Sequence, residues 1–205
     1  MTDHTFASAI IGAAQKHPRK PADYYPTPPE ATIALLDHLQ LPVGTSVWEP
    51  ACGDGAMSRV MESYGLDVTS TDLRIDCGYG RGGVDFLNTD LECDWIITNP
   101  PFSLAAEFIE HALTITPNVA MLLKSTYWHA KGRYDLFMSS APTQVLPLTW
   151  RPSFLEKERG NSPLMDVIWV VWQGKNERGT SYWPLRRPSA KVQLLTDDSL
   201  DNLLA

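Results

Sequence analysis

The sequence predicts an α/β fold: a mainly parallel sheet with helices on both faces and an antiparallel hairpin at one edge. Short apolar runs alternate with helical segments between residues 31 and 138, which is typical of strands joined by right-handed crossovers. The first of these strands ends in a glycine-rich turn, Pro50-Ala51-Cys52-Gly53-Asp54-Gly55, that leads into a helix. The last two strands have no helix between them, which favours an antiparallel pair.

The elements are predicted in chain order from hydrophobic periodicity. Residues 4–16 suggest an amphipathic helix, and the basic, proline-rich stretch 17–29 should be extended. Thr27 and Glu30 flank two prolines in the spacing of a capping box, so a helix is expected at 31–40. Further helices are expected at 56–64, 104–114 and 131–138, and strands at 46–49, 67–71, 94–98, 118–123, 144–148 and 165–172. Trp169 and Trp172 in the last strand should be core residues.

We expect one domain over residues 1–205, because 205 residues with 43% hydrophobic side chains can bury a full core. Its N-terminal helix and basic arm occupy 1–22, and a flexible tail occupies 195–205. The stretches 150–163 and 174–187 are predicted to be loops that contact substrate, and the second could form a small flap.

Composition and cysteine usage indicate a reduced, cytoplasmic protein. No apolar run approaches the ~20 residues of a membrane span, and the N-terminal stretch lacks the basic region of a secretory signal. The three cysteines, Cys52, Cys77 and Cys93, show no CxxC spacing and leave an odd one out. No metal site is expected.

The net charge of −7 is distributed unevenly along the chain. Residues 30–110 carry 14 acidic and 3 basic side chains, whereas residues 111–192 carry 11 basic and 5 acidic ones. The glycine turn lies in the acidic half, and the basic half could meet the phosphates of a nucleic acid. The candidates for phosphate contact are Lys124, Lys131, Arg133, Arg151, Lys157 and Arg159.

The most informative stretch is Asn99-Pro100-Pro101-Phe102, directly after the apolar strand at 94–98. Ligands bind at the carboxyl ends of strands in open α/β sheets. Two prolines end the strand there, so the Asn99 side chain is expected to point into the crevice. An amide oxygen, a backbone carbonyl and an aromatic face suit a flat heterocycle that carries an amino group. A helix cap at Ser103 is the purely structural alternative.

The glycine turn favours a cationic, nucleotide-like ligand. It lacks the third glycine of a dinucleotide fingerprint and the Gly-Lys-Ser/Thr of a phosphate loop. Glu49 and Asp54 would repel a pyrophosphate but suit the sulfonium and ammonium groups of S-adenosylmethionine. Asp72, at the end of the second strand, is placed to hold ribose hydroxyls. Asp85 could accept from the adenine amino group with Phe86 on the ring, or could be an ordinary loop residue.

Taken in order, Glu49-Pro-Ala-Cys-Gly-Asp-Gly55, Asp72, Asp85-Phe86 and Asn99-Pro-Pro-Phe102 resemble the motifs of the S-adenosylmethionine-dependent DNA amino-methyltransferases, the N6-adenine group in particular. Tyr25-Pro26-Thr27 is similar to that family's N-terminal cofactor motif. The resemblance covers about residues 23–125. It implies the Rossmann-like class I methyltransferase fold with a seven-stranded sheet, and the chain's size resembles stand-alone enzymes of phages and prophages.

The resemblance implies three sets of site residues. The catalytic set is Asn99, Pro100, Pro101 and Phe102. The set that binds the cofactor S-adenosylmethionine is Tyr25, Pro26, Thr27, Glu49, Pro50, Ala51, Cys52, Gly53, Gly55, Asp72, Leu73, Asp85, Phe86 and Asn99. The set that binds substrate is Phe102, Lys124, Tyr127, Trp128, Arg151 and Phe154. Phe154 would form a second aromatic wall for the base, with packing on the sheet as its alternative.

The expected reaction is methyl transfer to the exocyclic N6 of adenine in DNA. Hydrogen bonds to the Asn99 side-chain oxygen and the Pro100 carbonyl would draw the nitrogen toward tetrahedral geometry, so no strong general base is required. Phe102 would stack on the base, a contact worth roughly 1–3 kcal/mol, and the base must leave the duplex to be reached. Asparagine rather than aspartate at position 99 favours adenine on the family pattern.

Three alternatives remain open from the sequence. Methylation of a protein glutamine amide uses a similar Asn-Pro-Pro-Tyr motif, although Phe102 and the stretch Tyr25–Pro29 argue against it. Methylation of adenine or guanine in RNA shares the same pocket. A non-catalytic nucleic-acid-binding protein could retain the fold, although the intact motif argues against it. Fewer than 35 residues follow Trp172, where larger relatives carry a target-recognition domain, so short or lax sequence specificity is expected. The sequence does not decide the oligomeric state.

Overall fold

The computed structural model describes residues 26–129, 132–154 and 165–189. The expected N-terminal helix, the basic arm, Tyr25 and the expected tail lie outside the described residues, as do Lys131, Lys157 and Arg159. None of the helices in the described ranges has the length and apolar character needed to cross a bilayer.

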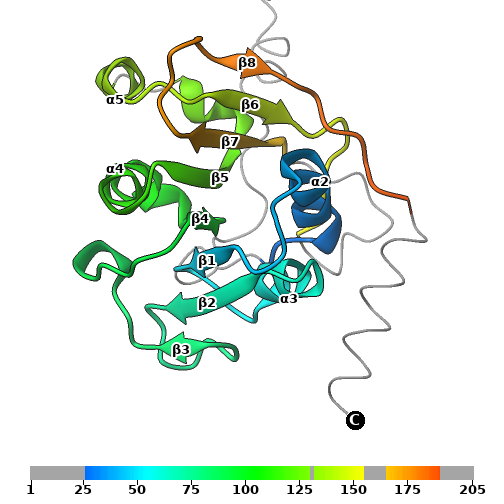
Figure 1. The fold of residues 1–205 in the computed structure, drawn as a ribbon, viewed down its shortest axis with the longest axis vertical. Coiled ribbons are helices and arrows are strands. Elements are labelled where there is room, and N and C mark those ends of the chain that lie inside the picture. Colours follow the sequence, from blue (N-terminus) through cyan, green and yellow to red (C-terminus); the bar gives the residue numbers. More distant parts are fainter. Residues whose placement is uncertain (1–25, 130–131, 155–164, 190–205) are drawn as a thin grey trace, which may run out of the picture.

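Eight strands form one sheet in the order β3-β2-β1-β4-β5-β7-β6-β8 (Figure 1). The five strands from β3 to β5 in this order are parallel neighbours, β7 is antiparallel to β5 and to β6, and β8 is parallel to β6. This arrangement confirms the predicted fold class. The strands are β1 (Ser46–Glu49), β2 (Asp67–Asp72), β3 (Arg81–Gly82), β4 (Trp95–Thr98), β5 (Asn118–Lys124), β6 (Gln144–Pro147), β7 (Val167–Gln173) and β8 (Ser181–Tyr182).

The eighth strand corrects two details of the sequence analysis. A flap was expected over 174–187, but Ser181 N–H donates to the Thr143 carbonyl at 2.9 Å and Trp183 N–H to the Val145 carbonyl at 3.0 Å. The segment therefore extends the sheet, and the antiparallel β6–β7 pair lies one strand in from the edge. The physical reason is that an edge strand presents unpaired backbone groups that favour a further partner.

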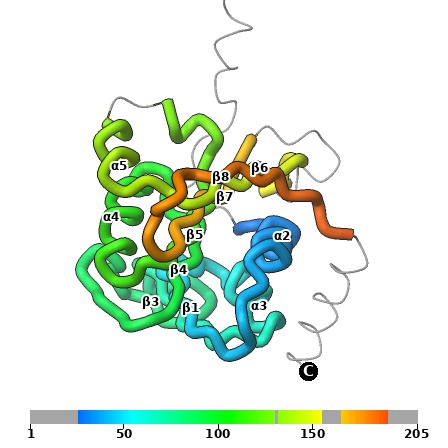
Figure 2. The backbone as a smooth tube through the Cα atoms, turned by 45° about the horizontal axis from the view of Figure 1, so that its top comes forward, coloured from blue at the N-terminus to red at the C-terminus, as the bar shows by residue number. Residues whose placement is uncertain are grey.

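Helices cover both faces of the sheet. α2 (Pro29–Leu39) and α3 (Ala56–Ser63) lie on one face, and α4 (Ala105–Ile115) and α5 (Arg133–Ser139) lie on the other (Figure 1 and Figure 2). Three short 3-10 turns, which follow β3, β4 and β5 in the chain, lie at Phe86–Asn88, Phe102–Leu104 and Ser125–Trp128.

Strand β7 supplies side chains to both cores. Trp169 packs in the core under α2 and α3, which we call core A, and Trp172 packs in the core under α4 and α5, which we call core B. Their relative exposures of 0% and 4% confirm the prediction that both are core residues. Each indole is also satisfied, because Trp169 Nε1 donates to the Ala31 carbonyl at 2.9 Å and Trp172 Nε1 to the Ser140 carbonyl at 2.8 Å. The first bond ties α2 to β7.

Helix α2 begins without the expected capping box. Its N-cap is Pro28, no side chain caps it, and Pro29 occupies the first turn, where a missing N–H costs nothing. Glu30 lies in that turn, as the helix dipole favours. The Thr27 hydroxyl that was expected to cap the helix contacts Asn99 instead, at the end of β4.

Candidate active site

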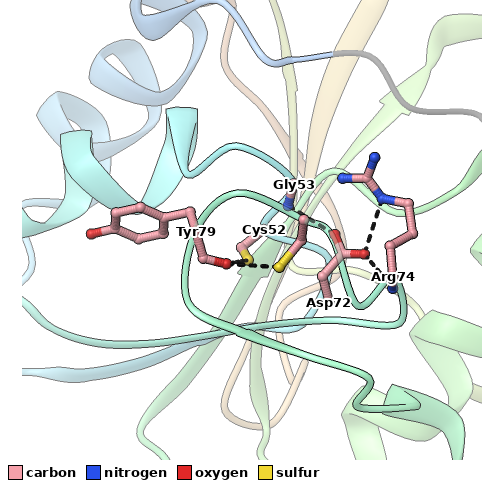
Figure 3. Close-up of polar contacts among 6 residues, drawn as sticks. Cys52, Gly53, Asp72, Arg74 and Tyr79 are labelled. Carbon is pink, nitrogen blue, oxygen red and sulfur yellow. Dashed lines mark hydrogen bonds and ion pairs between the residues drawn. The ribbon is translucent and has the colours of Figure 1, made fainter.

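The glycine turn lies at the carboxyl end of β1 and is anchored by β2. Gly53 and Gly55 have φ values of 59° and 81°, in the left-handed region that favours glycine. The Gly55 N–H donates to the Cys52 carbonyl at 2.8 Å, which closes the turn just before α3. The Gly53 N–H donates to Asp72 Oδ2 at 2.8 Å (Figure 3). The last residue of β2 therefore fixes the backbone of the turn.

The loop after β2 clamps the turn from outside. The thiols of Cys52 and Cys77 both donate to the Tyr79 backbone carbonyl, at 3.2 Å and 3.0 Å, and Figure 3 shows the Cys52 contact. The Tyr79 ring lies against Gly55, where an added Cβ would come within 2.3 Å of the ring. Burial, reinforced by the charge of Glu49, raises the pKa of Cys52 and keeps it a protonated donor.

Asp72 and Arg74 form a charged pair beside the turn (Figure 3). Asp72 Oδ1 accepts from the Arg74 backbone N–H at 2.8 Å and from its Nε at 3.2 Å. Leu73, between them, is 63% exposed although it lines the cleft described below. A fixed carboxylate beside an exposed apolar side chain suits the ribose and the flat base of an adenosine group.

Glu49, the last residue of β1, is buried at 2% exposure. It accepts from the hydroxyl of Ser58 on α3, and that hydroxyl lies 2.6 Å from the hydroxyl of Ser70. Burial raises the pKa of Glu49 to about 8, with the charges of Asp54 and Asp72 adding to the rise and the Ser58 hydrogen bonds opposing it. The carboxyl group is therefore mostly protonated at neutral pH, and a nearby cation would favour its ionised form.

Asp85 and Phe86 lie on the side of the cleft next to core B. Asp85 caps the short turn Phe86–Asn88, because its Oδ1 accepts from Leu87 N at 3.1 Å and its Oδ2 from Asn88 Nδ2 at 2.7 Å. Phe86 is only 2% exposed and packs edge-on against Trp48, with 5.0 Å between ring centroids. Both residues line the cleft, but most of the Phe86 ring belongs to the core.

Asn99 lies at the carboxyl end of β4, facing the segment that precedes α2. Its Nδ2 donates to Thr27 Oγ1 at 3.0 Å, and Thr27 is only 4% exposed. Because the donors of an amide are on its nitrogen, this contact orients the Asn99 side chain with its nitrogen toward Thr27. Pro101 occupies the N-cap position of the 3-10 turn Phe102–Leu104. The strand therefore ends before the two prolines, as predicted.

Phe102 and Lys124 meet at the ends of neighbouring strands. The Lys124 ammonium lies 4.0 Å from the centroid of the half-buried Phe102 ring, a cation–π geometry. β4 and β5 pair in register through Thr98 and Met121, which explains why two residues far apart in sequence lie together. The pair places a positive charge beside an aromatic ring, next to Pro101 on the wall of the cleft.

These elements surround one cleft, whose empty space is about 860 Å³ when its open mouth is counted. The predicted site residues that line it are Pro26, Thr27, Glu49, Pro50, Ala51, Cys52, Gly53, Asp72, Leu73, Asp85, Phe86, Asn99 and Pro101. Gly55 lies behind the turn against Tyr79. The fold thus brings together residues spread over more than seventy positions of sequence.

Tyr127, Trp128 and Phe154 of the predicted substrate set are placed mainly by packing. Tyr127 is 8% exposed, with the Arg133 guanidinium carbon 3.5 Å from its ring centroid, and Trp128 stacks on Phe137 at 4.4 Å. Phe154 is 7% exposed in core A, which corrects the expected second aromatic wall. Burial of a large apolar ring outweighs its exposure at a rim.

Sequence reasoning missed several residues that line the cleft. These are Ala56, Met57, Arg74, Val84, Leu87, Leu104 and Phe108. Arg74 carried a usable signal, because a basic residue two positions after Asp72 can pair with it. The others are apolar residues in helices, turns and loops, and nothing in the sequence separates them from ordinary core positions.

The side chains of the cleft fit a cationic adenosyl group better than a metal ion or a phosphate. Among the described residues, Glu49, Asp54, Asp72 and Asp85 line it, and Arg74 is the one basic lining residue. In the parts of the chain that the structure describes, no group of three or more His, Cys, Asp or Glu side chains could hold a metal ion. An acidic wall beside glycine backbone and exposed Leu73 matches the charge and shape of S-adenosylmethionine.

Comparison with known proteins supports the same fold and cofactor. No protein-family model matches the chain. A curated type II methyltransferase from Thermus thermophilus is 30% identical over 121 residues, which cover 54% of this chain and 28% of that protein. The chain therefore spans well under half of this curated relative.

Solved structures share the fold at low sequence identity. A "putative RNA methyltransferase" from Pyrococcus horikoshii superposes with a TM-score of 0.60 and 16% identity, covering 82% of this chain and 96% of that one. A modification subunit of a "putative type I restriction enzyme" from Vibrio vulnificus gives a TM-score of 0.58 and 14% identity, covering 82% and 48%. A "putative class I S-adenosylmethionine-dependent methyltransferase" from Listeria monocytogenes gives 0.55 and 14%, covering 89% and 73%. The chain has the fold of the class I S-adenosylmethionine-dependent methyltransferases.

Proposed function

We propose that this protein transfers a methyl group from S-adenosylmethionine to the exocyclic N6 of adenine in DNA. The observation that carries the proposal is the Asn99 side chain, whose nitrogen is tied to Thr27 at the end of β4 beside an acidic glycine turn. The similarity to a type II methyltransferase and to a restriction-modification subunit favours DNA as the substrate.

The residues on the acidic side of the cleft would hold the cofactor. When bound, S-adenosylmethionine supplies an electrophilic methyl group on a positively charged sulfur. Asp72 would hold the ribose hydroxyls, and Leu73 and the edge of Phe86 would contact the adenine ring, since all three residues line the cleft. Glu49, buried with a raised pKa, would gain a cation as its partner. Asp85 already accepts two local hydrogen bonds, so its remaining lone pairs would have to serve the adenine amino group.

Asn99 and Pro100 would activate the target nitrogen. The lone pair of an adenine amino group is delocalised into the ring, so the nitrogen is a weak nucleophile. The amino group would donate two hydrogen bonds, one to Asn99 Oδ1 and one to the Pro100 carbonyl. These bonds would pull the nitrogen toward tetrahedral geometry and localise its lone pair. No strong base is required, because the proton on the nitrogen becomes acidic as the new bond forms and can pass to water. The rate gain would therefore come from positioning and fixed dipoles.

The target base would have to leave the double helix to reach Asn99. Phe102 directly follows Pro101, which lines the cleft, and the Lys124 ammonium contacts the Phe102 ring at 4.0 Å. Stacking on such a face is worth roughly 1–3 kcal/mol and offsets part of the cost of unstacking the base. Phe102 and Lys124 together would accept a flipped base and a nearby phosphate.

Radiolabelled cofactor tests the proposal directly. The purified protein is incubated with tritiated S-adenosylmethionine and DNA, RNA or protein, and the DNA is digested to nucleosides. Label in N6-methyladenine is the expected result. Asn99→Ala should abolish transfer while cofactor affinity stays within about two-fold, because the amide acts on the target nitrogen. Transfer to cytosine, or normal turnover by Asn99→Ala, would reject the assignment.

RNA is the second candidate substrate. The structural neighbour described as a "putative RNA methyltransferase" matches 96% of its own length, more than either restriction-modification relative. The pocket proposed for adenine would serve either polymer once the base is extruded. Transfer to RNA that exceeds transfer to DNA of the same sequence would favour this alternative.

A further inference from the structure

The segment after β8 runs toward the candidate active site. The Leu185 N–H donates to the Pro147 carbonyl at 2.8 Å, and the Leu185 carbonyl accepts from Thr149 N–H at 3.1 Å. These bonds hold the segment along the carboxyl end of β6. The cleft lies on the same side of the sheet, at the carboxyl ends of the parallel strands. It then passes α2, as both ribbon and tube show (Figure 1 and Figure 2).

Arg187 brings this segment to the first turn of α2. Its guanidinium lies 3.5 Å from the carboxylate of Glu30, three residues after Thr27. Arg186 beside it is exposed, and the Arg187 side chain is 60% exposed despite the ion pair. Two arginines therefore reach solvent near the wall of the cleft that positions Asn99.

A chain of contacts connects Lys124 to a third arginine. Arg151 Nε lies 2.6 Å from Asp166 Oδ1, and the Asp166 carbonyl accepts from Ser125 N–H at 2.9 Å. Ser125 directly follows Lys124, whose ammonium contacts the Phe102 ring. We call Lys124, Arg151, Arg186 and Arg187 the basic rim.

Charge divides the carboxyl edge of the sheet into two parts. In the basic rim, Arg151 pairs with Asp166 and Arg187 pairs with Glu30. The cofactor side has the opposite balance, with four acidic side chains and Arg74 lining the cleft. The Arg151–Asp166 pair is exposed on both sides and is therefore weak and salt-sensitive, whereas in the Arg187–Glu30 pair only the arginine is well exposed. Both arginines can therefore reach a phosphate from the solvent side.

We infer that the basic rim binds the phosphate backbone of DNA on either side of the extruded base. The inference rests on the proposed function and adds to it the surface that holds the polymer. In a chain of net charge −7, this rim gives a polyanion a local site, and counterion release from the DNA would drive the contact. Guanidinium groups suit phosphates because their fork of donors matches the phosphate oxygens.

The segment between β7 and β8 provides a matched control at the opposite side of the sheet, where the amino end of β5 lies. Lys175 and Arg178 precede β8 and are exposed. The Gly174 N–H donates to the Pro117 carbonyl at 3.2 Å and the Asn176 amide to the Pro142 carbonyl at 2.8 Å, which places this half at the amino end of β5. Lys175 and Arg178 therefore lie across the sheet from the cleft.

The test compares Arg186→Gln/Arg187→Gln with Lys175→Gln/Arg178→Gln, which remove the same charge. The affinity of each full-length protein for an adenine-containing DNA duplex is measured between about 50 and 200 mM salt, with cofactor affinity measured in parallel. The rim variant should bind about ten-fold more weakly at the low-salt end, with a log–log salt slope smaller by about two. The control variant should keep the wild-type slope, and both should keep cofactor affinity. Equal losses in the two variants, or no loss in either, would overturn the inference.

Glu30→Gln separates phosphate binding from a structural role of the Arg187 pair. If Arg187 only anchors the segment through Glu30, Glu30→Gln should weaken DNA binding as Arg187→Gln does. If Arg187 binds phosphate, Glu30→Gln should leave DNA binding unchanged or tighter. Methyl transfer by wild-type protein is measured with the same duplex and with RNA of the same sequence. If the wild-type protein methylates DNA but the rim variant binds DNA as tightly as wild type, only the inference about the basic rim is rejected. If the wild-type protein does not methylate DNA, the proposed function is rejected. A rim-dependent affinity for RNA alone would reject DNA as the partner.

Discussion

Asn99 Nδ2 and Thr27 Oγ1 lie 3.0 Å apart although 72 positions separate them in the sequence. The contact joins the end of β4 to the segment before α2, and Thr27 is buried while Asn99 is partly exposed to the cleft. This hydrogen bond holds the Asn99 amide with its nitrogen toward Thr27.

Thr27→Val should therefore slow methyl transfer more than it weakens cofactor binding. Valine keeps the shape of threonine but accepts no hydrogen bond, so Asn99 can rotate away from its productive geometry. We expect kcat to fall about 10- to 100-fold, since small misplacements of reacting groups have effects of this size. Thr27→Ser, which restores the hydroxyl, should recover most of the rate in single-turnover measurements.

Thr32→Val is the control for that substitution. Thr32 lies in the same helix region at 0% exposure, and its hydroxyl has no hydrogen-bond partner among the described residues. Removing it should leave kcat unchanged and stability equal or higher. A Thr27→Val protein as active as Thr27→Ser would contradict the positioning role.

Cofactor affinity should rise with pH between about 6 and 8. Burial raises the pKa of Glu49 to about 8, so a cation that favours its carboxylate must displace a proton below that pH. The dissociation constant should fall by up to ten-fold per pH unit and level off above about 8. Glu49→Gln should bind more weakly at pH 8 and lose this pH dependence, as titration calorimetry in buffers of different ionisation enthalpy can show.

The same acid makes the protein without cofactor less stable at high pH. The unfolded chain ionises Glu49 near its ordinary pKa of 4.5, whereas the folded chain holds the proton up to about 8. Its contribution to stability is thus complete below 4.5 and is lost as pH rises through 8. Glu49→Gln should unfold at higher denaturant concentration than wild type at pH 8, and no difference there would contradict the assignment.

Gly55→Ala should damage the cofactor turn, while Gly44→Ala should not. Both glycines have φ of 81°, but a Cβ at Gly55 would meet the Tyr79 ring at 2.3 Å and a Cβ at Gly44 would meet nothing within 4 Å. We expect Gly44→Ala to cost about 1 kcal/mol and Gly55→Ala about 3 kcal/mol or more in urea unfolding. Similar costs for the two variants would show that the Tyr79 contact is unimportant.

Cys93 should react with alkylating reagents before Cys52 and Cys77. Cys93 is partly exposed, while Cys52 and Cys77 are buried and donate to the Tyr79 carbonyl. Burial raises the pKa of Cys93 to about 11, so its labelling rate should increase with pH up to that value. Mass spectrometry of partly labelled protein would locate the modified residue, and early labelling of Cys52 would contradict the structure of the turn.

The predictions from sequence succeeded where short-range signals are strong and differed where a distant partner decides. The glycine turn, the strand before Asn99 and the core positions of Trp169 and Trp172 follow from local periodicity and turn chemistry. Thr27 has the spacing of a helix cap, yet its hydroxyl bonds to Asn99 because the end of β4 comes close to it in space. The pairing of β8 with β6 was missed for the same reason.

The amino-acid sequence by itself determined the α/β fold class, the acidic glycine turn and the position of the Asn-Pro-Pro-Phe motif at a strand end. Each depends on neighbouring residues in the chain. Only the tertiary structure decided that Phe154 packs in a core, that Cys52 and Cys77 share one carbonyl, and that Arg187 after β8 pairs with Glu30 in the first turn of α2. Such contacts depend on which strands become neighbours in the sheet, and that choice is made by the packing of the whole chain.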